Sequence, residues 1–120
     1  MFDVTFFVVG KQAEENPELI RRMWQEGHEI GNHSLNHYPW MHTLSRAEVE
    51  YEILEAESLI EKATGQHPVG FRGPGYSFSD DLISILATRG YLYDATGSYD
   101  IVWYIAIGLG VLAGLVNLPD

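Results

Sequence analysis

The chain has 120 residues, of which 46% are hydrophobic, and this length suits one globular domain with a buried core. Seven basic and 17 acidic residues give a net charge of −10, so the chain repels phosphate backbones and nucleic acid is not expected as a partner. The absence of cysteine excludes disulfides, thiolate nucleophiles and cysteine-ligated zinc. The first residues have neither a basic start nor a long apolar run, so no signal peptide is expected.

The amino-terminal part predicts a buried strand followed by a helix. Residues 4–9 (VTFFVV) are β-branched or aromatic without interruption and are followed by Gly10, which is typical of a strand buried on both faces. Pro17 is expected at the first helical position, with Asn16 as the N-cap and Gly27 at the end of the helix. The apolar face of this helix is expected to comprise Leu19, Ile20, Met23 and Trp24.

A second strand and a long helix are expected next. Residues 28–32 (HEIGN) form a short strand candidate. Ser45 and Glu48 have the spacing of a capping box, and Gly65 is placed to end the helix that this box begins. The six glutamates of this helix are expected to form its solvated outer face. Its buried stripe is expected to comprise Val49, Ile53, Ala56, Ile60 and Ala63.

Two further strands and one more helix complete an alternating pattern. Strands are expected at residues 69–72 and 91–95, with a helix between them that begins after Ser79 and ends before Gly90. The order β-α-β-α-β-α-β with short connections predicts an α/β fold with a parallel sheet. Four such steps amount to about half of an eight-stranded barrel, so the alternatives are an open α/β sheet and a partial (β/α) barrel.

The carboxy-terminal part has a different composition. No charged residue occurs in residues 101–116 (IVWYIAIGLGVLAGLV). A helix of this length would reach ~24–27 Å, slightly less than the ~30 Å hydrocarbon core of a bilayer. We therefore divide the chain into residues 1–98 and an apolar segment, 99–120. That segment is either a membrane helix, centred on residues 101–118, or a buried or aberrant tail.

Candidate chemistry lies where the predicted strands end, because catalytic groups of parallel α/β folds occupy loops at the carboxyl ends of the strands. His33 and His37 follow the second strand, and two imidazoles four residues apart converge on one cation if the segment turns helically. Arg72 follows the third strand and offers a fork of donors that suits a carboxylate. Structural or surface roles remain the alternative for each of them.

Other polar residues are interpreted as structural. His28 is expected at a strand edge, and His42 and His67 are expected on surface loops. Asp94, at the end of the fourth strand, is interpreted as the cap of the following turn, with a site role as the alternative.

Three segments together resemble a known family: TFFVVG at residues 5–10, GHEIGNHSLNH at 27–37 and GFRGPGY at 70–76. They are similar, in order and spacing, to the polysaccharide deacetylases, which form carbohydrate esterase family four and include chitooligosaccharide and peptidoglycan deacetylases. The resemblance covers roughly residues 4–96. It implies a partial (β/α) barrel of the polysaccharide deacetylase type.

The resemblance also implies an activity and a set of roles. The reaction would be hydrolysis of N-acetyl groups on an amino-sugar polysaccharide or oligosaccharide, assisted by a divalent metal such as zinc. His33 and His37 would be metal ligands, Arg72 would orient the catalytic base, and Pro74 and Tyr76 would shape the substrate wall. The cell envelope or a membrane would be a fitting location for such an enzyme.

Two family features are missing from the expected places. An Asp-Asp pair should precede the TFFVVG strand, and Asp3 is a poor substitute because it lies at the wrong end of that strand, about 20 Å from its exit. The late Leu-x-His motif is also absent, since no histidine follows His67. We therefore expect a truncated and altered deacetylase chain that lacks a third metal ligand and has little activity. The alternatives are a small-amide or ureide hydrolase on the same scaffold and a non-catalytic or membrane-tethered binding module.

Overall fold

The structure is a computed structural model that describes residues 4–93 together with the backbone of two short strands at 102–105 and 112–115. Its helices are α1 (Gly10–Glu15), α2 (Pro17–Gln25), α3 (Arg46–Thr64) and α4 (Asp80–Thr88), with short 3₁₀ turns at Met41–Thr43 and Pro74–Tyr76. Its strands are β1 (Thr5–Val8), β2 (Glu29–Asn32), β3 (Gly70–Phe71), β4 (Leu92–Tyr93), β5 (Val102–Ile105) and β6 (Leu112–Leu115).

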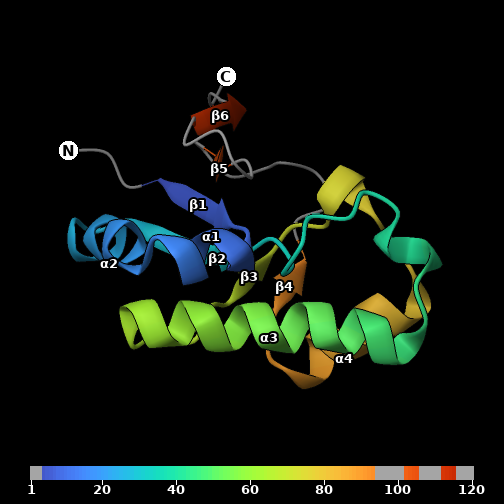
Figure 1. Cartoon of the computed structure of the whole chain (residues 1–120). Helices are drawn as coiled ribbons and strands as arrows, with labels where there is room; N and C mark the ends of the chain where they lie inside the picture. The colour runs from blue at the N-terminus through green and yellow to red at the C-terminus, as the bar shows by residue number, and fades with distance from the viewer. Residues whose placement is uncertain (1–3, 94–101, 106–111, 116–120) are drawn as a thin grey trace.

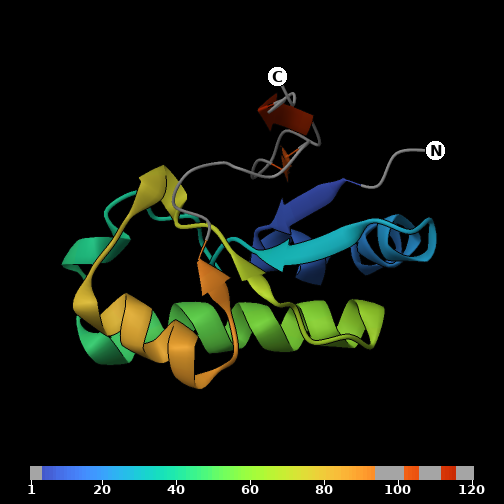
Figure 2. The same cartoon turned by 180° about the vertical axis from the view of Figure 1, so that it is seen from behind.

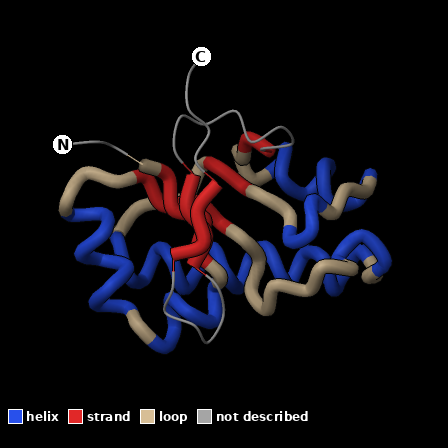
Figure 3. The backbone as a smooth tube through the Cα atoms, turned by 90° about the horizontal axis from the view of Figure 1, so that it is seen from above, coloured by secondary structure: helices blue, strands red, loops and turns tan. Residues whose placement is uncertain are grey.

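The strands form one sheet in the order β4-β3-β2-β1-β5-β6 (Figure 1). The first four strands are parallel and stand beside their neighbours in the sequence, as successive strands of a (β/α) barrel do. Helices α3 and α4 lie on the same side of these strands, as Figures 1 and 2 show from two opposite directions, and Figure 3 gives the view from above onto the strands. The predicted α/β class with parallel βα repeats is therefore confirmed.

The register of the parallel strands aligns their carboxyl ends at one edge of the sheet. Val8 is opposite Asn32, Asn32 is opposite Phe71, and Phe71 is opposite Tyr93. The residue that follows each strand is therefore delivered to the same edge of the sheet. This edge carries His33 after β2 and Arg72 after β3.

Two hydrophobic clusters hold the helices against the sheet. One joins β1 and β2 to α1, α2 and the end of α3, and the other joins Phe71 to α3 and α4. The predicted stripe of α3 is buried at every position, because it faces the sheet along the whole helix. Gly10 lets α1 approach α3 closely, since a Cβ atom there would lie 2.8 Å from the Cα of Ala56.

The capping predictions for α3 are confirmed and the one for α2 is partly wrong. Ser45 and Glu48 form a reciprocal capping box, and Gly65 ends α3 in the left-handed conformation. Asn16 precedes α2 as predicted, but its side chain makes no capping hydrogen bond and donates to Gln12 instead. The reason is the helix α1, which the sequence analysis did not predict and which ends beside Asn16.

The apolar face predicted for α2 is narrower in the structure. Ile20 and Met23 are buried, whereas Leu19 and Trp24 are 49% and 37% exposed. Only a narrow stripe of this nine-residue helix, at Ile20 and Met23, packs against the core. The apolar residues beside this stripe therefore remain in contact with solvent.

The interpretation of all six α3 glutamates as a solvated face is wrong for two of them. Glu52 and Glu57 are buried, with exposures of 3% and 4%. Their burial is compensated by hydrogen bonds from Asn36, Arg89 and Tyr91.

The apolar carboxy-terminal segment contains β5 and β6. Strand β5 pairs parallel with β1 on the side opposite β2, and β6 pairs antiparallel with β5. Among the residues that the structure describes, no helix has the length and apolar character needed to cross a bilayer. The rest of segment 99–120 lies outside the described residues, so the domain division at residue 98 and the membrane role of 101–118 stay predictions.

Candidate functional site

His33 and Arg72 meet at the carboxyl edge of the sheet because adjacent strands deliver them there. The His33 backbone N–H donates to the carbonyl of Val8 at 3.0 Å, and the Arg72 N–H donates to the carbonyl of Asn32 at 3.1 Å. These bonds continue the parallel ladders by one residue. Both side chains are buried, with exposures of 2% for His33 and 0% for Arg72.

The His33 ring is oriented by a backbone carbonyl. Its Nδ1 atom lies 2.6 Å from the carbonyl oxygen of Arg72, and because that oxygen only accepts, the proton must be on Nδ1. This tautomer puts the ring's lone pair on Nε2, the arrangement typical of metal-binding histidines. Burial lowers the pKa of His33 to about 3, with smaller contributions from His37 and Arg72, so the ring is neutral at neutral pH.

His37 lies next to His33, but not through a helical turn. The two ring centroids are 4.7 Å apart, at an interplanar angle of 62°. Ser34 and His37 both have positive φ, 68° and 60°, so the condition of a helical turn stated from the sequence is wrong. The connection is a tight loop in which the His37 N–H donates to the Ser34 hydroxyl at 3.0 Å. Burial also lowers the pKa of His37.

Arg72 stacks between two aromatic rings. Its guanidinium carbon lies 4.8 Å from the centroid of the Phe7 ring and 5.9 Å from that of Tyr76. Such contacts stabilise a cation away from bulk water and fix the plane of the guanidinium fork. Arg72 is therefore a rigidly held positive charge beside the two imidazoles.

Pro74 and Tyr76 lie in the turn that follows Arg72. Pro74 is buried, whereas Tyr76 is 48% exposed, so only the tyrosine ring is presented to solvent. The Ser77 hydroxyl lies 2.9 Å from the carbonyl oxygens of both Pro74 and Pro39. This contact fastens the turn after β3 to the loop after β2.

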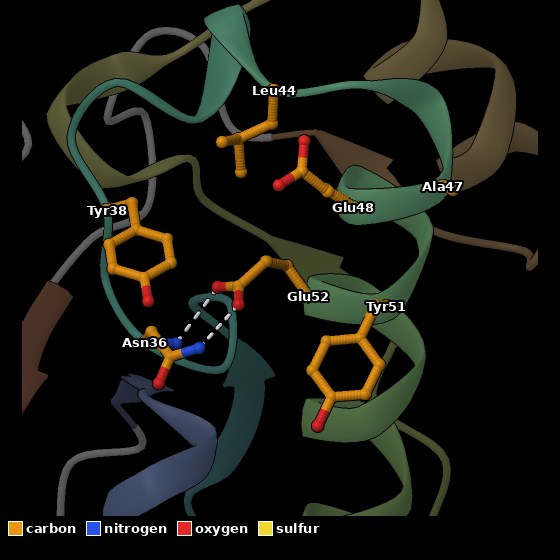
Figure 4. A pocket seen from close by; sticks show the side chains of 7 residues that line it. All are labelled: Asn36, Tyr38, Leu44, Ala47, Glu48, Tyr51 and Glu52. Atoms are coloured by element: carbon orange, nitrogen blue, oxygen red, sulfur yellow. Dashed lines mark hydrogen bonds between the residues drawn. The ribbon is translucent and has the colours of Figure 1, made fainter.

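The loop that carries the histidines is held by a buried glutamate of α3. Glu52 accepts from the Asn36 backbone N–H at 3.0 Å and from its side-chain amide at 2.6 Å (Figure 4). The sequence analysis missed this role, although a signal existed. Glu52 follows Val49 by three residues and precedes Ala56 by four, so it shares their buried face.

A second network of hydrogen bonds holds the beginning of the same loop. The Asn32 amide donates to the Tyr91 hydroxyl at 3.0 Å and to the carbonyl of Ile53 at 3.1 Å, while its carbonyl accepts from the Ser34 N–H. The Tyr91 hydroxyl donates to Glu57, which also accepts from Arg89. Sequence reasoning did not find this network, because its members are far apart in the chain.

Glu57, Glu61 and His67 form a group whose potential ligand atoms lie within 4.8 Å of one another. Both ring nitrogens of His67 have partners, Glu61 at 2.8 Å and the carbonyl of Arg89 at 3.0 Å. Burial lowers the pKa of His67, but these hydrogen bonds and the two carboxylates outweigh it, so the pKa is raised. The group is therefore an ion-pair cluster at the end of α3.

The other singled-out residues lie mostly as expected. His28 directly precedes β2 and accepts from the Val4 N–H at 3.3 Å, while His42 and His67 are exposed. Asp3 and Asp94 lie outside the described residues, so their roles stay predictions.

Comparison with known proteins identifies the family. The model of the polysaccharide deacetylase family matches residues 2–93. The chain belongs to the polysaccharide deacetylase family. The resemblance carried by the three sequence segments is thereby confirmed.

Individual relatives agree with this assignment. The chain is 40% identical over 87 residues to a chitooligosaccharide deacetylase of Sinorhizobium fredii and 35% identical over 89 residues to a peptidoglycan-N-acetylglucosamine deacetylase of Bacillus cereus. These matches cover 72% and 74% of the chain but 40% and 41% of the relatives. The chain thus spans about two-fifths of the length of these curated relatives.

Solved structures are similar as well. A family 4 carbohydrate esterase from Streptomyces lividans in complex with acetate matches 76% of this chain and 47% of its own chain, at 32% identity and a TM-score of 0.72. A family 4 pseudoenzyme from Bacillus anthracis matches 84% of this chain and 34% of its own, at 28% identity and the same TM-score. The fold is thus shared with a carbohydrate esterase and with a pseudoenzyme of family 4.

Proposed function

We propose that the protein is a metal-dependent hydrolase that removes N-acetyl groups from an amino-sugar polysaccharide or oligosaccharide. The supporting observation is the pair of neutral imidazoles, His33 and His37, held 4.7 Å apart beside Arg72 at the carboxyl edge of the sheet. Metal ligation requires neutral histidine, and a backbone carbonyl already fixes the tautomer of His33.

Each residue of the site has a role in this proposal. His33 and His37 would hold a divalent ion such as zinc, and both offer the neutral nitrogen donors that zinc accepts. Such an ion, when bound, would polarise the acetamide carbonyl and activate the attacking water. Arg72, fixed between Phe7 and Tyr76, would orient the carboxylate that acts as the catalytic base.

Pro74 and Tyr76 would form the wall against which the sugar lies. The exposed ring of Tyr76 offers an apolar surface to a pyranose ring, and the buried Pro74 fixes the turn that presents it. The substrates named for the relatives, chitooligosaccharide and peptidoglycan, suggest a polymer of N-acetylated amino sugars.

The described residues bring only two imidazoles together at this edge, whereas most catalytic zinc sites supply three protein ligands. We therefore expect the two histidines by themselves to bind zinc weakly and to support little acetate release. An aspartate at this edge, as a third ligand, should increase both the zinc affinity and the acetate release.

The test is a zinc titration by calorimetry of the wild type and of three variants: His33→Ala, His37→Ala and the control His42→Ala. The first two should lose at least tenfold in zinc affinity, as expected when one of two ligands is removed. His42 is exposed and engages Ser77, so its replacement should leave zinc affinity unchanged. Unchanged affinity in both His33→Ala and His37→Ala would contradict the proposal.

The similarity to a family pseudoenzyme favours a second candidate, a non-catalytic module that binds the sugar polymer. The two functions differ in one measurement. Binding of N-acetylglucosamine oligomers without zinc-dependent acetate release, in a chain extended by an aspartate-bearing strand, would favour the binding module.

A further inference from the structure

A cavity of about 330 Å³ lies between the loop after β2 and the beginning of α3 (Figure 4). The residues that line it are Asn36, Tyr38, Leu44, Ala47, Glu48, Tyr51 and Glu52. Ala47, Glu48, Tyr51 and Glu52 form two adjacent pairs four residues apart, so they share one face of the first turns of α3, whereas Leu44 precedes the helix. The lining includes two tyrosines and two carboxylates and no basic residue.

The two carboxylates make the cavity negative. Hydrogen bonds from the backbone and side chain of Ser45 hold the pKa of Glu48 below its usual value. Glu52 accepts both of its hydrogen bonds from Asn36, and each carboxylate oxygen retains a further lone pair. Both carboxylate groups point into the space between the loop and the helix (Figure 4). The cavity therefore disfavours an anion and favours a cation or a ligand rich in hydrogen-bond donors.

The two tyrosines add surfaces that suit an organic cation. Tyr51 is 58% exposed, and the Tyr38 ring is held by stacking on Trp40, with centroids 5.4 Å apart and an interplanar angle of 20°. Tyrosine rings attract cations to their faces and also bind apolar C–H surfaces. A volume of this size is at the lower end of small-molecule sites, roughly 300–1,000 Å³, and fits one sugar unit with its substituents.

The cavity adjoins the candidate catalytic site through the histidine loop. Asn36 and Tyr38, which line it, are the two neighbours of His37 in the chain. A sugar polymer that places one unit at His33 and His37 can therefore extend toward this cavity. The product of the proposed reaction is a primary amine, which becomes an ammonium group in mildly acidic solution, and carboxylates beside it favour that charged form.

We propose that this cavity binds a deacetylated amino-sugar unit of the polymer, with its ammonium group between Glu48, Glu52 and the tyrosine rings. The inference rests on the proposed function, because that reaction generates the ammonium group. An N-acetylated unit carries no charge and binds the cavity more weakly. The protein consequently favours chains that are already partly deacetylated.

The experiment is a titration, followed by backbone amide NMR shifts, with a glucosamine trimer and separately with an N-acetylglucosamine trimer. A chelator is present throughout, so that binding to a metal does not contribute. The glucosamine trimer should bind at least about fivefold more tightly and shift the amides of Asn36, Glu48 and Tyr51. Equal affinities for the two trimers, or shifts confined to the turn after β3, would overturn the proposal.

Matched variants locate the site. Glu48→Gln removes the charge but keeps a capping residue, since glutamine also serves in a capping box. Glu55→Gln removes an exposed charge of the same helix that does not line the cavity. The first should weaken glucosamine trimer binding about fivefold and the second should not change it. Equal effects of both variants would reduce the interaction to net charge and refute the proposal.

Two further measurements complete the design. Tyr51→Ala, at an exposed position, should also weaken binding of the glucosamine trimer, and unchanged binding would count against the cavity. Glu48→Gln should bind zinc as the wild type does, because the proposed metal ligands are His33 and His37. Loss of zinc affinity in His33→Ala and loss of trimer affinity in Glu48→Gln are separate readouts, so either proposal can fail without the other.

Discussion

His33 has two features that suit the metal-ligand role proposed for it. A buried imidazole is costly to protonate, and its Nδ1 proton is already committed to the Arg72 carbonyl. Metal ions compete with protons for imidazole, so a low pKa removes that competition at neutral pH. The same feature makes folding depend on pH.

The stability of the metal-free protein should rise as pH increases from about 3 to about 6.5. In this interval the unfolded chain protonates His33 and the folded chain does not, so protons favour unfolding. His33→Asn, whose amide can donate to the same carbonyl, should flatten this rise. Unfolding free energies from urea titrations at several pH values measure it, and the exposed His42→Asn serves as the control. Identical pH profiles for His33→Asn and the wild type would contradict the assignment.

Glu52 is the residue whose removal should most directly loosen the histidine loop. Glu52→Gln can accept only one of the two hydrogen bonds that Asn36 donates, so one buried group is left poorly satisfied. A loss of about 1–3 kcal/mol in unfolding free energy is expected. Glu55→Gln, an equal chemical change at an exposed position, should stay within about 0.5 kcal/mol of the wild type. Equal unfolding midpoints in urea for the two variants would show that the Asn36 contacts contribute nothing.

Among the elements, α3 supports both the sheet and the site. Its inner face packs on the core, and the same helix contributes Glu52 to the histidine loop and Glu57 to the Tyr91 network. The position of the site therefore depends on where this helix begins. The capping box at Ser45 fixes that starting point.

Ser45→Ala should destabilise the protein by about 1 kcal/mol, because the N–H of Glu48 loses its acceptor. Ser58 offers the matched control, since it is exposed within the same helix and alanine has the higher helix propensity. Ser58→Ala should therefore be neutral or slightly stabilising. Thermal unfolding of both variants checks the pair, and equal melting temperatures would contradict the role of the cap.

Local sequence signals predicted the helices and strands well, but they predicted the contacts between these elements less well. The α3 stripe and its caps follow from spacing alone, and the parallel order of β1 to β4 follows from the alternation of strands and helices. The helical turn considered for residues 33–37 does not form, because Ser34 and His37 adopt left-handed backbone conformations. The spacing of two histidines does not report such backbone conformations. The burial of Glu52 could have been predicted from its spacing on the Val49 face, but the partners of Glu52 and Glu57 come from other elements, which spacing does not report.

At the scale of the whole molecule, a chain of hydrogen bonds connects the strand that bears His33 to helices α3 and α4. Tyr91 links Glu57 of α3 to Asn32 of β2, and Arg89 at the end of α4 closes the chain on Glu57. Burial raises the pKa of Tyr91 further above neutrality, so its hydroxyl stays protonated and can donate. Strand β2, whose end carries His33, is thus tied to two helices by polar contacts as well as by packing.

A double-mutant cycle on Tyr91→Phe and Glu57→Gln measures whether this chain acts as a unit. Each single change should cost about 1–3 kcal/mol, because a buried partner is left unsatisfied. Once the Tyr91 hydroxyl is gone, Glu57→Gln has less to lose, so the double variant should be more stable than the sum of the single losses predicts, by at least about 0.5 kcal/mol. Tyr91→Phe combined with Ser45→Ala should be additive within the same margin, since the hydrogen bonds of these two residues have no partner in common. Additivity in both pairs would mean that the contacts act independently and that Tyr91 does not couple α3 to the strand that bears His33.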